Sequence, residues 1–141
     1  MKGVGVLAAL ALQAAQGPAP DLSQECQIET VTLCDQAGCR GVEPTLKIYL
    51  GEYAAEDGKH RGYYYRCRRA DLCDIIENPW IGENGGYRAF VARERGVIAK
   101  IGPENRITDI ATIEDRVLIS RGRCWDARRP SVTRDGKLTA E

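Results

Sequence analysis

Six cysteines, all placed after a short apolar N-terminal segment, constrain this chain more than any other feature. An even number of cysteines in an exported chain is typical of a disulfide framework, and six cysteines allow about 15 different pairings. Their spacing favours two local bridges and one bridge that joins the two ends of the domain. The predicted pairs are Cys34–Cys39, Cys67–Cys73 and Cys26–Cys124.

Other uses of these cysteines are disfavoured by their spacing. The chain has no C-x-x-C pair, the motif that dithiol oxidoreductases and many cysteine-based zinc sites use. A single histidine leaves little material for a His-rich metal site or a histidine relay. We therefore predict neither a metal nor a cofactor.

Residues 1–17 have the order of a secretory signal peptide. A basic start at Met1-Lys2 precedes an uncharged run over 3–12, and small residues follow at Ala14, Ala15 and Gly17. The run is too short to span a membrane, and the sequence leaves the cleavage position open between residues 14 and 17. The alternative is an uncleaved apolar helix docked on the domain. We expect a periplasmic or secreted protein with no membrane span.

Apolar and polar residues alternate with a period of two through most of the remaining chain. In 46–50, for example, Leu46, Ile48 and Leu50 fall on one face of an expected strand. Glycine, asparagine and proline mark turns between such runs. The pattern predicts an all-β fold, a single antiparallel up-and-down barrel or twisted meander. About eight strands are expected, near residues 26–34, 40–51, 62–69, 72–78, 86–93, 96–101, 106–113 and 116–122.

A chain of 141 residues has room for one domain with one modest core. We expect the signal peptide over 1–17, a linker over 18–25 and the antiparallel β domain over 26–125. Residues 126–141 are polar apart from Val132 and Leu138. They are predicted to form a disordered tail whose removal leaves stability nearly unchanged.

The sequence contains no recognisable catalytic motif. His60 lies in a charged turn, and Ser120 lacks the G-x-S-x-G context of a hydrolase nucleophile. Paired carboxylates could hydrolyse an envelope sugar, but they must face each other across a cleft. The formal net charge of zero removes the simplest argument for a nucleic-acid partner. No catalytic residue is predicted.

Two features suggest binding. Trp80 lies in an expected loop over 78–86, where it either presents an aromatic anchor to a partner or folds back to plug the core. The segment from Arg116 to Arg134 holds six arginines and one acid. Of these, Arg121 and Arg123 share a strand face, and we expect them to emerge at the open rim of a barrel. The predicted binding residues are Trp80, Arg121 and Arg123.

The cysteine layout, with Gly38-Cys39-Arg40, Tyr65-Arg66-Cys67 and Ser120-Arg121-Gly122-Arg123-Cys124, resembles that of small exported, cysteine-stapled β-meander proteins of Gram-negative bacteria. The resemblance implies a fold and an export route but no activity. In size and export signal the chain is also similar to periplasmic lysozyme inhibitors, although their serine- and glycine-rich inhibitory stretch is not found. We expect an exported, non-catalytic binding or envelope-associated β protein, an inhibitor or polyanion binder, whose partner is a protein or an anionic envelope component. The alternative is a small carboxylate-dependent hydrolase.

Overall fold

A computed structural model describes residues 22–139, so the predicted signal peptide lies outside the described residues. Ten antiparallel strands form one sheet, and three single turns of 3-10 helix connect some of them. Residues 22–25, predicted as linker, belong to the first strand. The strands are β1 (Leu22–Asp35), β2 (Gly38–Val42), β3 (Lys47–Ala54), β4 (His60–Cys67), β5 (Cys73–Glu77), β6 (Trp80–Asn84), β7 (Tyr87–Ala92), β8 (Val97–Ile101), β9 (Arg106–Ile113) and β10 (Arg116–Asp126), with η1 (Arg69–Asp71), η2 (Arg93–Arg95) and η3 (Pro103–Asn105).

The first and last strands lie side by side in the middle of the sheet. The strand order is β5-β4-β3-β1-β10-β9-β8-β7-β6, and β2 forms a hairpin with β1. Cys26 lies directly opposite Cys124 on these central strands, and the two are bridged. The other bridges join Cys34 to Cys39 and Cys67 to Cys73. The all-β, disulfide-stapled antiparallel fold and the three predicted pairings are confirmed.

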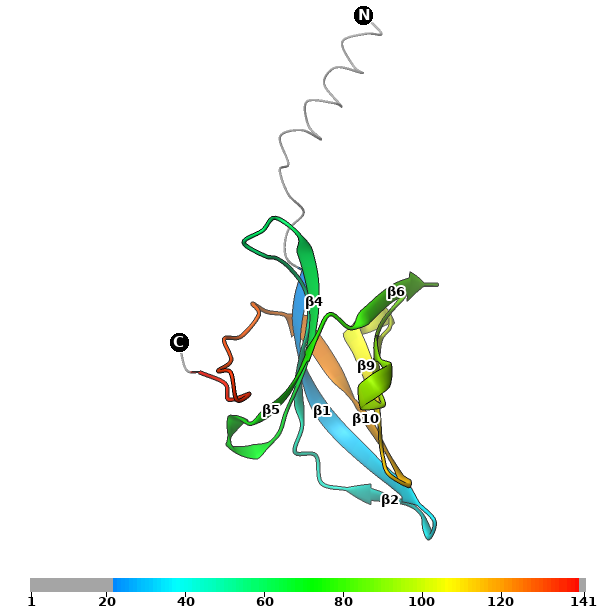
Figure 1. The fold of residues 1–141 in the computed structure, drawn as a ribbon. Helices are drawn as coiled ribbons and strands as arrows, with labels where there is room; N and C mark the ends of the chain where they lie inside the picture. Colours follow the sequence, from blue (N-terminus) through cyan, green and yellow to red (C-terminus); the bar gives the residue numbers. More distant parts are fainter. Residues whose placement is uncertain (1–21, 140–141) are drawn as a thin grey trace, which may run out of the picture.

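The sheet curves into a half-barrel whose two edge strands, β5 and β6, follow each other in the chain (Figure 1). The short connection between them is held on β4, because Asn78 N–H donates to the Gly62 carbonyl at 3.0 Å. A Cβ at Gly62 would lie 2.6 Å from Ile81 Cδ1. Glycine at this position therefore leaves room for the Ile81 side chain where the β5–β6 connection lies against the start of β4.

Two features of the strand prediction were wrong. The expected strand over 40–51 is divided into β2 and β3, and residues 43–46 between them are outside regular structure. Pro44 explains the break, because proline lacks the N–H that a sheet ladder needs. The expected loop over 78–86 contains β6. Gly85 and Gly86, at φ of 61° and 83°, form its tight turn into β7, the conformation that two-residue hairpins favour.

The core lies inside the curve of the sheet. Ile48 and Leu50 of β3 are fully buried there, as the alternation predicted. Tyr64 of β4 and Phe90 of β7 meet edge to face across the interior, with ring centroids 6.5 Å apart. Side chains from both halves of the sheet therefore build one apolar cluster.

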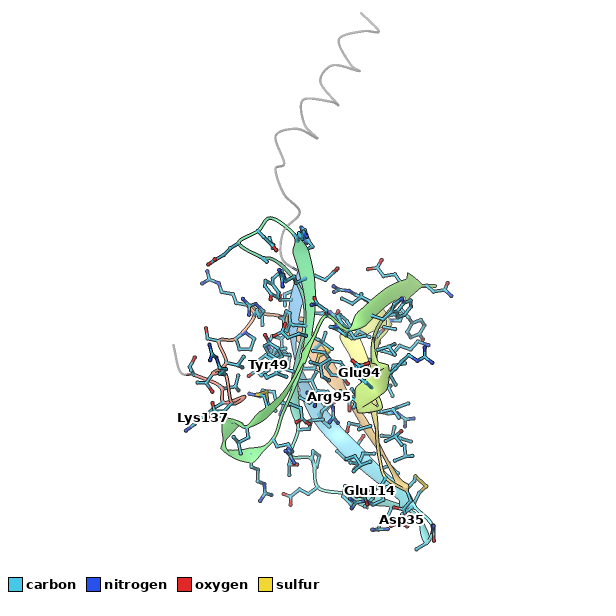
Figure 2. The ribbon with its side chains drawn as sticks, viewed as in Figure 1. Asp35, Tyr49, Glu94, Arg95, Glu114 and Lys137 are labelled. Atoms are coloured by element: carbon cyan, nitrogen blue, oxygen red, sulfur yellow. A yellow bond between two sulfur atoms is a disulfide. The ribbon has the colours of Figure 1, made fainter. Side chains whose placement is uncertain are left out.

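The C-terminal segment packs against the sheet, contrary to the prediction of a disordered tail. It lies along β5 in Figure 1, where Cys73 N–H donates to the Gly136 carbonyl at 2.6 Å. Val132 and Leu138 contact a cluster that the outward side chains of β3 and β4 form, namely Tyr49, Tyr63, Tyr65 and Cys67. These tyrosines supply an apolar surface that two apolar residues suffice to cover. Tyr49 and Lys137 mark this side of the molecule in Figure 2.

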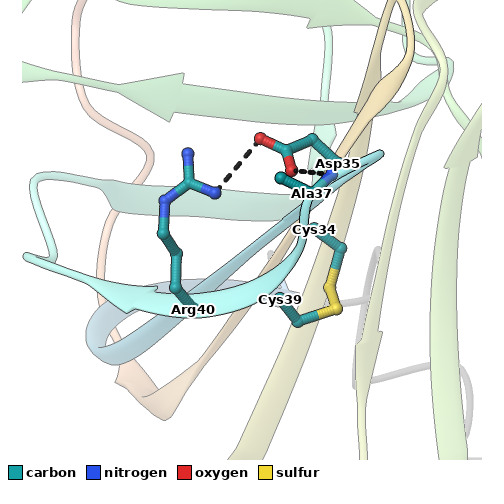
Figure 3. Close-up of a disulfide and its surroundings, with 5 residues drawn as sticks. All are labelled: Cys34, Asp35, Ala37, Cys39 and Arg40. Carbon is teal, nitrogen blue, oxygen red and sulfur yellow. Dashed lines mark hydrogen bonds and ion pairs between the residues drawn. A yellow bond between two sulfur atoms is a disulfide. The ribbon is translucent and has the colours of Figure 1, made fainter.

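The hairpin of β1 and β2 ends in a small, locally bonded tip (Figure 3). Asp35 accepts a hydrogen bond from Ala37 N–H at 2.9 Å and another from the Arg40 guanidinium at 3.1 Å. Both hydrogen bonds lower the pKa of Asp35, and the one from the Ala37 backbone N–H has the larger effect. The Cys34–Cys39 bridge closes the same turn, so the tip carries its own cross-link.

Candidate functional site

The outer face of β6–β10 carries an apolar row that crosses all five strands. Residues directly opposite each other in an antiparallel pair point to the same side of the sheet. The pairing register therefore places one residue from each strand in line: Trp80, Val91, Ile98, Ile110 and Ile119. Four strand spacings of about 4.8 Å give the row a length of about 19 Å.

The burial of these side chains shows that the row faces solvent. Trp80 is 64% exposed, and the other four residues of the row are half-buried. The six-membered ring of Trp80 lies over Gly82, where an added Cβ would fall 2.1 Å from Cη2 of the ring. Trp80 therefore does not fold back into the core. It is an exposed aromatic side chain, and it lies on a strand and not in a loop.

Positive charge lies directly beside the apolar row. Two residues further along each strand, on the same face, the register aligns Lys100, Thr108 and Arg121. Another two residues along, Arg106 of β9 lies opposite Arg123 of β10. Within β6–β10, every Asp and Glu occupies a position of the opposite parity, which points inward. We call Lys100, Arg106, Arg121 and Arg123 the basic band. The basic band thus holds four cations, and no outward-pointing residue of β6–β10 is an Asp or Glu.

The partners of the basic band leave it accessible. Arg123 lies 3.8 Å from Glu29, and Arg106 lies 3.7 Å from Glu104; all four side chains are more than half exposed. Exposed ion pairs of this kind contribute little, about 0–1 kcal/mol. Lys100 lies over the Tyr87 ring at 4.4 Å. Arg121 is exposed, and residues 22–139 place no carboxylate within 4 Å of it.

The structure brings the three predicted binding residues onto one face but corrects where the arginines lie. Trp80, Arg121 and Arg123 all point outward from β6–β10. The arginines were expected at an open rim. They lie instead mid-strand on the outer wall, because β10 continues to Asp126 and pairs with β1 along its length. Sequence reasoning missed Lys100 and Arg106, although the alternation within 96–101 and 106–113 would have placed them on the outward side.

The other half of the outer wall is covered. Arg129 of the C-terminal segment lies over the Tyr53 ring at 3.8 Å and donates to Tyr65 Oη at 3.4 Å. Burial, with the nearby negative charge of Glu25, raises the pKa of Tyr49 to about 12. Burial also raises the pKa of Tyr65. Arg129 thus packs on the tyrosines of β3 and β4, on the other side of β1 from Arg121 and Arg123.

A buried polar network lies inside the half-barrel. Arg66 donates to both carboxylate oxygens of Asp109, at 3.1 and 2.9 Å, and Tyr64 donates its hydroxyl hydrogen to the same carboxylate. Asp109 is fully buried. Burial and the charge of Asp109 hold the pKa of Tyr64 far above its usual range. With every partner supplied by the protein, this network links β4 to β9 and serves the structure.

Carboxylates also meet at one end of the half-barrel, where a cavity of about 880 Å³ is lined by Glu83, Arg88 and the segment 126–129, among others. Arg88 donates to Glu52 at 2.9 Å and lies 3.9 Å from Glu83. The two carboxylates share one guanidinium, an arrangement that suits an ion-pair network better than an acid facing a base. His60, the other candidate base, is exposed at the start of β4.

Within residues 22–139, no three His, Cys, Asp or Glu side chains gather as a metal site would require, and no helix is long and apolar enough to cross a membrane. No protein-family model, curated protein or solved structure matches the chain.

Proposed function

We propose that this chain is an exported, non-catalytic binding protein that recognises an anionic partner through the outer face of β6–β10. The observation that carries the proposal is the basic band. It gathers four cations on the outward positions of three adjacent strands, none of them opposed by a carboxylate of those strands. Clustered charge of one sign attracts an oppositely charged partner even when the whole molecule is neutral.

Export is part of the same proposal. Three disulfides fit an oxidising periplasmic or extracellular compartment, and the order of residues 1–17 is that of a signal peptide. The test is cell fractionation of the expressing bacterium, followed by mass spectrometry of the recovered chain. We expect a periplasmic or secreted product that has lost 14–17 N-terminal residues and contains no free thiol.

Binding is tested with heparin as a soluble polyanion at low salt. The native protein should bind, and raising the salt to about 0.5 M should release it, because screening weakens interactions between exposed charges. Arg121→Gln with Arg123→Gln should weaken binding by at least about fivefold. Arg68→Gln with Arg69→Gln is the matched control, since it removes the same charge from exposed positions outside the five strands. Equal losses from both double variants would refute the assigned surface.

A further inference from the structure

The cations of the outer face are not spread at random: they adjoin an apolar surface. Arg121 follows Ile119 by two residues on β10, and Lys100 follows Ile98 in the same way on β8, so each pair shares the outward face of its strand. The result is an amphipathic wall, with the apolar row on one side and the basic band on the other. A soluble polyanion would contact only the basic band and would leave the apolar row exposed to water.

Trp80 gives this wall the character of an interfacial surface. Its side chain is 64% exposed at the free edge of the sheet, at the end of the apolar row. Tryptophan is favoured at membrane–water interfaces, where its ring lies at headgroup level. Arginine and lysine beside apolar surface extend their charged ends toward phosphates while their stems stay among apolar groups.

A second copy of the chain fits this wall less well. The outward positions of β6–β10 hold four cations and no carboxylate. Two copies packed face to face along the apolar row would therefore bring like charges close together, which is unfavourable. The covered half of the molecule supports the contrast, since Val132 and Leu138 already shield the tyrosines of β3 and β4.

We infer that the outer face of β6–β10 docks onto a lipid surface bearing phosphate headgroups. The basic band contacts the phosphates, and Trp80 enters the interface with the apolar row. The inference rests on the proposed function and specifies its partner. An interfacial protein of this kind lies on the membrane and does not cross it.

The test uses the exported protein with vesicles of neutral phospholipid, alone or with about one-third anionic phospholipid. Any contribution from the residues that precede β1 is common to all variants. Binding should require the anionic lipid. Because each cation near such a surface strengthens binding about fivefold, Arg121→Gln with Arg123→Gln should lower partitioning about 25-fold. The matched Arg68→Gln, Arg69→Gln variant should change it by about twofold or less. Circular dichroism checks that each variant keeps its fold.

Tryptophan fluorescence identifies the docking face. The chain has two tryptophans, so Trp125→Phe leaves Trp80 as the only reporter, and Trp80→Phe leaves Trp125. We expect vesicles to shift the emission of Trp80 to shorter wavelength and to protect it from iodide. Trp125 follows Arg123 by two residues on the outward side of β10, beyond the basic band, and should respond less than Trp80. Vesicle-induced changes in Trp125 alone would overturn the assigned face.

The remaining outcomes separate this inference from the function on which it rests. Binding to heparin without binding to anionic vesicles would overturn the lipid assignment and leave the proposed function intact. Binding to neither would refute both. Self-association that shields Trp80 from iodide in the absence of lipid would show that a second copy occupies the face, and would overturn the inference.

Discussion

Asp109 is the residue on which the interior depends most. Its carboxylate is fully buried, and its partners Arg66 and Tyr64 reach it from β4, across the half-barrel. We predict that Asp109→Asn lowers the free energy of unfolding by about 3–5 kcal/mol, because it leaves the Arg66 charge buried without its counter-ion. Urea unfolding followed by circular dichroism measures the loss.

A double variant separates pairing from packing at this site. Arg66→Met with Asp109→Leu removes both charges and keeps apolar volume, so it should recover most of the stability that Asp109→Asn loses. A single variant within about 1 kcal/mol of the native protein would contradict the account. Sequence alone did not identify this pair, because the two residues are 43 positions apart and only the curvature of the sheet brings them together.

The buried tyrosines predict the response to alkali. The folded protein holds the pKa of Tyr49 at about 12 and raises those of Tyr64 and Tyr65, whereas an unfolded tyrosine has a pKa of about 10. Above about pH 10 the unfolded state therefore releases protons that the native state keeps. The contribution of these tyrosines to stability should be constant below that pH and should fall as pH rises, by at most about 1.4 kcal/mol per pH unit for each such tyrosine.

Two measurements check the alkaline prediction. Urea midpoints at intervals from pH 8 to 11.5 give the slope, and phenolate absorbance shows which tyrosines ionise before unfolding. Tyr64→Phe should make the slope shallower, because it removes a proton that the native state retains. A stability that stays flat through pH 11.5 would contradict the prediction.

The C-terminal segment is the element whose structure differs most from what its sequence predicts. Residues 126–141 are polar enough to predict disorder, yet residues 127–139 cover the tyrosines of β3 and β4. Removing residues 128–141 should lower the free energy of unfolding by about 2 kcal/mol, from the burial lost at Val132 and Leu138. In thermal unfolding this corresponds to a fall of about 8 °C in Tm.

Point variants locate that effect within the segment. Leu138→Asp should reproduce much of the loss, because it places a charge against the tyrosine cluster. Arg134→Ala is the matched control at an exposed position of the same segment, and it should leave Tm unchanged. A truncated protein with the native Tm would restore the original prediction of a dispensable tail.

Strand positions were largely predictable because each depends on local alternation and turn chemistry. The seven expected strands outside 40–51 each overlap a strand of the structure, and the Pro44 break and the Gly85-Gly86 hairpin are local signals that were misjudged. The sequence could not supply register between distant strands. That register alone aligns Trp80 with Ile119, which lie at opposite ends of a five-strand row. The site could therefore be predicted as residues but not as a surface.

At the scale of the whole molecule, the Cys26–Cys124 bridge joins the first and last strands across 98 residues of chain. Both strands are central to the sheet, so the bridge limits how far the unfolded chain can open. In the loop-closure account, a loop this long contributes about 4–5 kcal/mol to the free energy of unfolding, whereas the five-residue separation of Cys34 and Cys39 contributes about 2 kcal/mol.

We predict that Cys26→Ala with Cys124→Ala lowers the free energy of unfolding at least twice as much as Cys34→Ala with Cys39→Ala. Urea unfolding under non-reducing conditions measures both, and thiol labelling verifies that the remaining bridges are intact. Equal costs for the two double variants would show that local packing around each bridge, and not the length of chain that it closes, determines its contribution.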